Sequence, residues 1–521
     1  MKLSKLTLTV ATILGVTLSS AAFAIELYVD THTKQIYAEP GKGRKLMGKF
    51  VHIEEKNAHH KHQEGEHDFA DIKAIQEDLA LKNNAIKALE EKAEAASTSA
   101  SGMPTVTMDK KGLQVISKDK NFKFKFGGRI HADASFAGED NYFDSKGHHV
   151  RPDDGTEIRR ARMRMEGVFF KDWLFRTEVD FGGDAVNAKD VYLQYLGAPH
   201  VIITAGQQKQ NFSRELQESS NDMMFTERSL MNVLNTDTVD RAIGLNLESF
   251  GKNYVAKLGV FGNSLKPHGT TTTADLKTGA VTTSNKAGDE GWAISSRLAY
   301  APINEKGKLI HLGVAGNYRV PDTNGEVAES KSFAYGYKTT EMSNFNPLKQ
   351  SITGAKDIKM LGLEFASIYG PFSLGGEYTR TWIDRVGRTG AIANQNVSFD
   401  GWYADAAYTL TGESRTYKNG NMTHLKIDKP FNPSKGNWGA VEAAIRYSGV
   451  NLNDGSFASG GIRGGKMNEI TGGLNWYFNS NFRLLANYTR LLNITGSPLT
   501  TVGGQKMDGM GTFMLRGQVA F

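Results

Sequence analysis

The sequence predicts an all-β fold: a closed antiparallel barrel of sixteen transmembrane strands, preceded by a helical coiled-coil segment. Three observations lead to this prediction. From residue 122 onward, apolar and polar residues alternate with a period of two, which is typical of strands with one apolar and one polar face. The connections between these strands alternate between short and long. After Ala24 there is no run of 18 apolar residues, so membrane-spanning helices are not expected.

The composition excludes several kinds of site. The 521 residues include no cysteine, which rules out disulfides, thiolate zinc sites, iron–sulfur clusters, a cysteine nucleophile and a lipoprotein anchor. Lys and Arg number 62 against 56 Asp and Glu, a net charge of +6 without a long basic tract. A nucleic-acid partner is therefore not expected. No cofactor is expected either.

Residues 1–24 have the pattern of a secretory signal peptide. Lys2 and Lys5 precede an apolar run over 6–18, and small residues end at Ala22-Phe23-Ala24. A charged start, a short apolar stretch and an Ala-x-Ala exit are recognised by the export machinery. The alternative is a membrane anchor, but the run is shorter than the ~20 residues needed to span a bilayer.

Residues 25–69 form a polar segment rich in histidine. It holds six of the 13 histidines. Clustered histidines can bind zinc or copper, and the weak candidates for metal ligands are His59, His60, His62 and His67. Since their spacing fits no predicted element, we interpret the segment as a solvated linker and expect no metal site.

Residues 70–96 are predicted to form a coiled-coil helix. The pattern consists of residues spaced alternately by three and four, which is the a and d spacing of a heptad. These positions are Ile72, Ile75, Leu79, Lys82, Ile86, Leu89 and Ala93. Lys82 would weaken the seam, and a single amphipathic helix lying on another surface is the alternative. Residues 97–111 are predicted to be a linker, which is flexible over Ser97–Pro104.

The barrel is predicted over residues 112–521. In its first strand, Phe122, Phe124 and Phe126 alternate with Lys123 and Lys125. The sixteen predicted strands are 122–136, 157–169, 173–182, 188–196, 201–206, 241–249, 253–261, 290–301, 308–319, 358–368, 371–383, 398–411, 437–448, 466–478, 481–493 and 510–521.

The connections support a transmembrane barrel. The short ones are 170–172, 197–200, 250–252, 302–307, 369–370 and 479–480, and the long ones 138–156, 207–240, 262–289, 320–357 and 494–509. An even strand count with alternating connections is typical of outer-membrane barrels, where a closed sheet satisfies its own backbone groups. Residues 412–436 break the alternation, since this connection should be short. A soluble propeller or tandem sandwiches would not predict the alternation.

The polar strand faces would line a water-filled lumen. On the second strand Arg160, Arg162 and Arg164 share the polar parity, about 6.6 Å apart, and would form a ladder along which an anion could move. Arg159 has the opposite parity and is expected at a strand end or a bulge. The predicted anion pathway comprises Lys123, Lys125, Arg129, Arg159, Arg160, Arg162, Arg164, Arg176, Arg297, Arg319, Arg446 and Arg483.

Acidic residues share these faces, so the predicted anion preference is modest. They are Asp133, Glu166, Glu178, Asp180, Glu377 and Glu442. The alternative interpretation is that the arginines only solvate a polar wall and pair with these acids. The long connection 207–240 is expected to fold inward and narrow the barrel. Its constriction cations would be Lys209, Arg214 and Arg228.

The chain resembles the phosphate-selective porins O and P of Gram-negative outer membranes over roughly residues 112–521. The similarity lies in FKFGGRI (124–130), EIRRARMRMEG (157–167), DWLFRTEVDF (172–181), SRLAYAP (296–302), HLGVAGNYR (311–319), ADAAYTLTGESRTYK (404–418) and GGLNWYFNSNFRLLANYTR (472–490). The AYTLTGESRTYK block is the most specific. It spans the start of the connection that breaks the alternation, so this anomaly is expected to be a family trait.

The resemblance implies a homotrimer of sixteen-stranded barrels in outer-membrane lipid, with a narrow arginine-lined lumen that passes small anions such as phosphate. Arg159 and Arg160 match the paired arginines of the family motif, and Arg297 and Arg319 lie inside shared blocks. Phosphate-selective members have a lysine in the constricting loop, where this chain has Asn221. High phosphate selectivity is therefore not implied. The coiled coil would be a periplasmic extension of the trimer.

Three classes of function were weighed. A passive, anion-preferring porin fits the alternation and the lumen cations. A barrel enzyme would need a Ser, His and acid set or paired carboxylates, and no such motif spacing is present. A general or weakly selective porin with a structural or adhesive surface role remains the alternative, because of the coiled coil and the long loops.

Overall fold

The computed structural model describes residues 25–30, 36–37, 44–50, 87, 103–109, 112–138, 141–150, 152, 154–183, 186–265, 271–274, 281–284, 290–322, 331–338 and 345–521. These residues belong to two compact units, one within residues 1–103 and the other comprising Pro104–Phe521. The predicted signal peptide, the four histidine candidates and, apart from the helical Lys87, the predicted coiled coil lie outside the described residues.

The first unit contains a small antiparallel sheet. Its strands are β1 (Ile25–Asp30), β2 (Ile36–Tyr37) and β3 (Arg44–Phe50), in the order β2-β1-β3. We had predicted no strands in this segment. The strands have two to seven residues, which is too short for an alternating pattern to stand out from the surrounding polar sequence.

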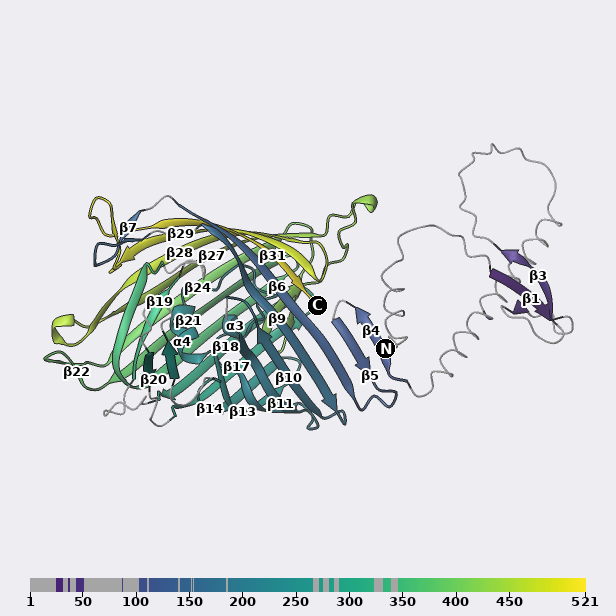
Figure 1. The fold of residues 1–521 in the computed structure, drawn as a ribbon, viewed down its shortest axis with the longest axis horizontal. Coiled ribbons are helices and arrows are strands. Elements are labelled where there is room, and N and C mark those ends of the chain that lie inside the picture. Colours follow the sequence, from purple (N-terminus) through teal and green to yellow (C-terminus); the bar gives the residue numbers. More distant parts are fainter. Residues whose placement is uncertain are drawn as a thin grey trace, which may run out of the picture. The chain divides into compact units, whose positions relative to one another are not determined.

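The second unit is a closed antiparallel barrel, and sixteen long strands of the described residues form its wall (Figure 1). These strands are β6 (Lys123–Ala137), β9 (Gly155–Phe169), β10 (Trp173–Asp180), β11 (Asn187–Tyr195), β12 (Val201–Lys209), β13 (Arg241–Phe250), β14 (Tyr254–Phe261), β17 (Trp292–Glu305), β18 (Lys308–Val320), β20 (Leu348–Tyr369), β21 (Phe372–Arg385), β24 (Val397–Thr409), β27 (Ala440–Asp454), β28 (Ile462–Tyr477), β29 (Phe482–Thr495) and β31 (Met510–Ala520). The predicted fold class is confirmed.

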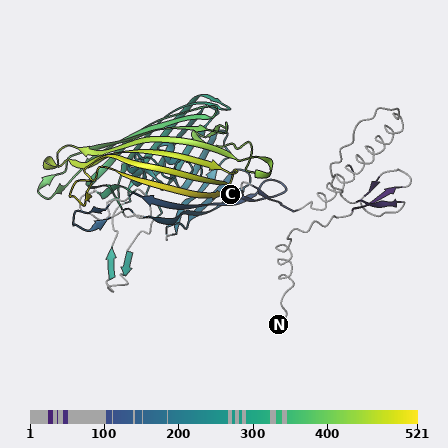
Figure 2. The same cartoon turned by 90° about the horizontal axis from the view of Figure 1, so that it is seen from above.

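Pairing of the first and last strands closes the barrel. β31 pairs with β6 from Thr512 opposite Ala137 to Ala520 opposite Arg129. Phe521 continues this pairing, because its N–H and carbonyl exchange hydrogen bonds of 3.0 and 2.9 Å with Gly128. In Figure 2 the green and yellow strands of the second half of the chain lie in front of the teal strands of the first half, and the two sets form opposite walls.

Shorter strands extend the barrel. β4 (Thr105–Asp109) and β5 (Gly112–Ile116) form a hairpin on the start of β6, so the predicted linker 97–111 includes a strand. β19 (Lys331–Tyr337) pairs with the start of β20. The remaining short strands are β7 (Tyr142–Phe143), β8 (His149–Val150), β15 (Thr271–Ala274), β16 (Val281–Ser284), β22 (Arg388–Thr389), β23 (Ile392–Ala393), β25 (Arg415–Lys418), β26 (Asn421–Leu425) and β30 (Thr500–Thr501).

Side chains alternate between the outer surface and the lumen along each strand. On β29, Leu484 and Tyr488 are exposed on the outside, whereas Arg483 and Asn487 are buried inside. Trp and Tyr pairs lie across neighbouring strands, as in the contact of Trp173 with Tyr195. Such outward rings suit a membrane interface. None of the described helices is both long and apolar enough to cross a bilayer.

The two ends of the barrel differ. Short turns join β9 to β10, β13 to β14 and β20 to β21 at one end, which we name the turn end, and the long connections lie at the opposite loop end. The exception is the connection from β24 to β27, which contains the β25–β26 hairpin. The predicted break in the alternation is therefore real, and the extra residues form a hairpin that packs against the inner wall.

The largest apolar cluster lies inside the barrel. The connection from β12 to β13, which we name the constriction loop (residues 210–240), carries helices α3 (Arg214–Gln217) and α4 (Asn232–Val239). Its Phe212, Leu230 and Leu234 are fully buried and belong to one cluster with Tyr335 of β19 and Phe399 of β24. The loop is therefore packed across the lumen as a fixed element.

Candidate functional site

The arginines of β9 face the lumen, as their parity predicts. Arg160, Arg162 and Arg164 all line one central cavity of about 800 Å³. Arg159 lines it as well, because the pairing of β9 with β6 shifts by one residue where His131 faces Arg160 and Ala132 faces Ile158. Of the two places expected for Arg159, a strand end or a bulge, the structure shows the bulge, which turns a side chain of the outward parity inward.

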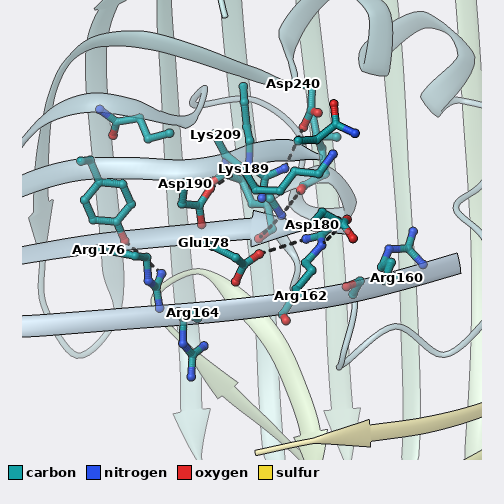
Figure 3. A pocket seen from close by; sticks show the side chains of 18 of the residues that line it. Arg160, Arg162, Arg164, Arg176, Glu178, Asp180, Lys189, Asp190, Lys209 and Asp240 are labelled. Atoms are coloured by element: carbon teal, nitrogen blue, oxygen red, sulfur yellow. Dashed lines mark hydrogen bonds and ion pairs between the residues drawn. The ribbon is translucent and has the colours of Figure 1, made fainter. Parts of the chain in front are cut away.

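Several of these arginines form close ion pairs with neighbouring strands (Figure 3). Arg162 lies 3.1 Å from Glu178 and 2.7 Å from Asp180. Glu178 also accepts a hydrogen bond of 3.0 Å from Arg129. Arg176 pairs with Glu166 and donates to the hydroxyl of Tyr192 at 2.9 Å. The acids of β10 thus compensate part of the lumen's positive charge.

Arg160 and Arg164 have weaker partners. The nearest carboxylate oxygen lies 3.9 Å from Arg160, on Glu227, and 3.7 Å from Arg164, on Glu166. Arg160 has a further contact of 3.5 Å with His131. Both line the central cavity, Arg164 with 20% of its side chain exposed and Arg160 with 4%.

The constriction loop is tied to the opposite wall by buried polar groups. The backbone N–H groups of Arg214 and Glu215 donate to the carboxylate of Glu377 at 2.9 and 2.6 Å. The Arg214 guanidinium donates to Tyr403 at 2.6 Å. Thr226 N–H donates to Asn487 at 2.6 Å. These bonds replace water at a loop whose polar groups would otherwise be buried unpaired.

Two further arginines, one on β27 and one on β31, bind the constriction loop. Arg446 lies 3.4 Å from Glu215 and 3.1 Å from Glu469. Arg516 pairs with Asp133 at 2.6 Å and with Glu227 at 3.1 Å. Burial alone would raise the pKa of Glu227, but the positive charges of Arg159, Arg160 and Arg516 hold it well below its usual range. Glu227 therefore stays ionised and partly neutralises these arginines.

Of the three predicted constriction cations, Lys209 and Arg228 lie together, because both donate to the carbonyl of Glu218. Lys209 donates to the carbonyls of Leu216, Gln217 and Glu218 at 2.7, 3.3 and 2.9 Å. Arg228 donates to two loop carbonyls, of Glu215 and Glu218, and lines the central cavity together with Lys209. Arg214 is buried against β21 and β24, as described above. These cations serve mainly to hold the shape of the loop.

The β25–β26 hairpin enters the lumen from the turn end. Its Arg415 forms a buried ion pair with Glu442 of β27 at 2.7 Å. The carbonyl of Gly420 accepts a hydrogen bond of 2.7 Å from Arg297, and Asn419 and Asn421 line the central cavity. Arg415 also donates to the carbonyl of Asp222 at 3.1 Å, so the hairpin contacts the constriction loop. These two elements narrow the barrel from opposite ends.

The remaining predicted pathway residues are spread over the barrel. Arg297 is fully buried on Glu364 at 2.7 Å and is covered by the hairpin. Arg446 is likewise buried. Lys125 and Arg483 line a cavity of about 270 Å³ at the turn end, which we name the exit cavity. Arg319 lines one of about 700 Å³ at the loop end, the outer cavity. Lys123 is an exposed residue at the first position of β6.

The three cavities adjoin one another through shared residues. Lys189, Arg241 and Asp240 are among the residues that line both the outer and the central cavity. Arg164 and Ser219 line both the central and the exit cavity. Asn221 lies in the exit cavity, where its amide oxygen is 3.2 Å from His131.

Positive charges outnumber negative ones in the central cavity. Its described lining holds eleven Arg and Lys side chains against six Asp and Glu. Three of these cations, Lys189, Arg241 and Lys257, are not among the residues predicted from the sequence. Lys257 on β14 and Arg516 on β31 have the inward parity of their strands. Both could have been predicted, as Arg162 was, by assigning the polar parity of each strand to the lumen. Lys189 has the parity of the exposed Leu193 and could not.

No metal centre is visible in the residues that the structure describes, since none of their His, Asp and Glu side chains form a group of three around a common point. The histidine candidates lie outside these residues, so their prediction stays untested.

Comparisons with known proteins agree with this architecture. A family model described as "Phosphate-selective porin O and P" matches residues 124–492. Porin O of Pseudomonas aeruginosa is 27% identical over 425 residues, which cover 76% of this chain and 89% of the relative. Among solved structures, an anion-selective porin from Comamonas acidovorans aligns with 14% identity over 77% of this chain and 100% of its own, at a TM-score of 0.46. A loop-deletion mutant of OmpT from Vibrio cholerae aligns at 10% identity with the same coverage and TM-score. Since the family model spans most of the barrel and the relative matches nearly end to end, the chain belongs to the family of phosphate-selective porins O and P and is a protein of the outer membrane.

Proposed function

We propose that this porin allows passive diffusion of small anions, such as phosphate, through a water-filled, arginine-lined lumen. The observation that carries the proposal is that cationic side chains outnumber acidic ones around the central cavity, eleven against six. Fixed positive charge in a narrow channel with low-dielectric walls raises the local concentration of anions. Family membership supports a channel rather than an enzyme.

The path runs through the outer, central and exit cavities in turn. An anion in the central cavity meets Arg160 and Arg164, whose nearest carboxylates are more than 3.5 Å away. Conduction requires binding that favours entry but is weak enough to allow release. Guanidinium groups with weak partners meet this requirement, because a passing anion can bind them without first breaking a close ion pair.

The selectivity is expected to be modest. Arg129, Arg162 and Arg176 each form a hydrogen-bonded pair with an acid, and such pairs attract a mobile anion less than a free cation does. A general or weakly selective porin is therefore the second candidate, with a structural or adhesive surface role as an addition. A homotrimer in outer-membrane lipid is part of the same proposal.

Planar-bilayer recording of the purified protein tests the function. We expect ion-conducting steps and, in a KCl gradient, a reversal potential that favours the anion. Phosphate should carry current itself or reduce the chloride current. Failure to conduct would overturn the porin proposal, and a reversal potential that favours the cation would overturn the anion preference.

A double variant, Arg160→Gln with Arg164→Gln, tests the path. We expect the anion-to-cation permeability ratio to fall by roughly threefold to tenfold, because two fixed charges leave the narrow lumen. The matched control is Lys466→Gln with Arg490→Gln, which removes two exposed charges from strands β28 and β29. If the control lowers the ratio as much as the lumen variant does, these arginines do not line the path.

A further inference from the structure

A β-bulge on β11 turns Lys189 into the lumen. In the pairing of β10 with β11, Thr177 faces Val191 and Val179 faces Ala188, so β11 has one residue more than β10 in this interval. Lys189 would otherwise share the outward parity of Val191 and Leu193. Because bulges re-aim side chains, both Lys189 and Asp190 line the central cavity.

Lys189 lies at the junction of two cavities. It lines the outer cavity at the loop end and also the central cavity. Thr236 of α4 lines both as well, so the constriction loop borders the same junction. Figure 3 shows the Lys189 side chain among the residues that line the central cavity. Because Lys189 borders both cavities, an anion that moves from the outer to the central cavity passes within reach of its side chain.

The Lys189 ammonium is not neutralised by a close acid. Among the described residues it forms no ion pair within 4.0 Å. The other cations nearby are paired: Arg241 lies 2.7 Å from Asp190 and 3.5 Å from Asp240, and Arg162 is held by Asp180 at 2.7 Å. Those pairs occupy the acids that Lys189 would otherwise contact.

We infer that Lys189 is a selectivity-determining residue, which binds the charged group of a small anion as it passes from the outer to the central cavity. The inference rests on the proposed function and adds to it the place where anions are first selected. A lysine suits this task because its compact ammonium on a flexible stem can follow a moving anion. The bulge of Arg159 on β9 adds a second inward cation in the same way.

The test compares Lys189→Gln with the wild type in a KCl gradient at low salt. Glutamine keeps most of the side-chain length and removes the charge. We expect the anion-to-cation permeability ratio to fall by roughly threefold at about 0.1 M salt and the difference to shrink at about 1 M, where charges are screened within about 3 Å. Lys189→Arg should keep the wild-type ratio, and circular dichroism should show unchanged β-sheet content for both variants.

The matched control is Lys466→Gln, which removes one exposed charge from β28. An unchanged ratio for Lys189→Gln, or an equal fall for the control, would overturn the inference while leaving the proposed function standing. A wild-type protein without anion preference would instead overturn the proposed function. The two failures are therefore distinguishable.

Discussion

Arg162 and Arg164 lie two residues apart on β9 and line the same cavity, yet their charges are available to different degrees. Arg162 is held 2.7 Å from Asp180, whereas the nearest carboxylate oxygen of Arg164 lies 3.7 Å away. Arg297, in contrast, is fully buried with Glu364. At the scale of single residues, the distance to the nearest acid therefore decides whether an arginine holds the wall together or meets an ion.

The pH dependence of conductance belongs to this scale as well. Glu218 lies in the constriction loop beside Ser219, which lines the central cavity. Burial raises the pKa of Glu218 to about 7, against the opposing charges of Arg214 and Arg415. The carboxyl is thus neutral below that pH and charged above it. Raising the pH from 6 to 8 adds one negative charge to the loop, and we expect the anion preference to fall.

Reversal potentials measured between these two pH values check this prediction, and Glu218→Gln should reduce the change. The raised pKa of Glu218 also makes the stability of the fold depend on pH. The unfolded pKa of glutamate is about 4.3, so the folded state binds the proton more tightly. The contribution of Glu218 to stability is greatest below the unfolded pKa and declines as the pH rises through 7. An equally large fall in anion preference in Glu218→Gln would contradict the assignment to this residue.

At the scale of elements, two connections fold into the barrel and narrow its lumen. The constriction loop is tied to the opposite wall through Glu377, Asn487 and Arg516. The β25–β26 hairpin is tied through Arg415 and Glu442. Each element connects two strands that pair directly with each other, β12 with β13 and β24 with β27, so the barrel wall is continuous beside it.

The variant Glu442→Gln should release the hairpin. Removing one partner of a buried ion pair leaves the charge of Arg415 uncompensated and costs about 3–5 kcal/mol. We expect a higher single-channel conductance, because Asn419 and Asn421 then leave the central cavity. Glu305→Gln, at an exposed position on β17, is the control. Wild-type conductance and thermal stability in Glu442→Gln would show that this pair does not hold the hairpin in place.

At the scale of the whole molecule, the barrel is a unit of its own. Its first and last strands close it, and the sheet over residues 25–50 belongs to a separate unit. The barrel's closure therefore does not require the N-terminal residues, which leaves them available for another task. The heptad pattern over 70–96 predicts that this task is association of the chains.

Deletion of residues 25–102, with the signal peptide retained, tests that expectation. A coiled coil that links the chains raises their effective concentration, so we expect the proposed trimer to dissociate at a lower temperature in detergent without it. Lys82→Ile in the full chain should raise that temperature, because a charge leaves the predicted seam. Equal dissociation temperatures for the full and shortened chains would show that this segment does not hold the assembly together.

The sequence alone determined the sixteen strands and their faces. These features follow from the two-residue period of an extended backbone, which is local. The largest difference is at β20, which begins at Leu348 rather than at 358. Its additional residues pair with β19, and this pairing has no counterpart in the local pattern.

Only the tertiary structure decided which cations face an ion and which are neutralised. Arg516 and Asp133 pair across 383 residues of sequence, and Arg415 finds Glu442 only because the hairpin turns inward. The bulge that turns Lys189 inward depends on how β10 and β11 are aligned. Such partners are chosen by the closing of the barrel and the packing of loops within it. A period of two along the chain determines the face of a residue but not its neighbour across the lumen.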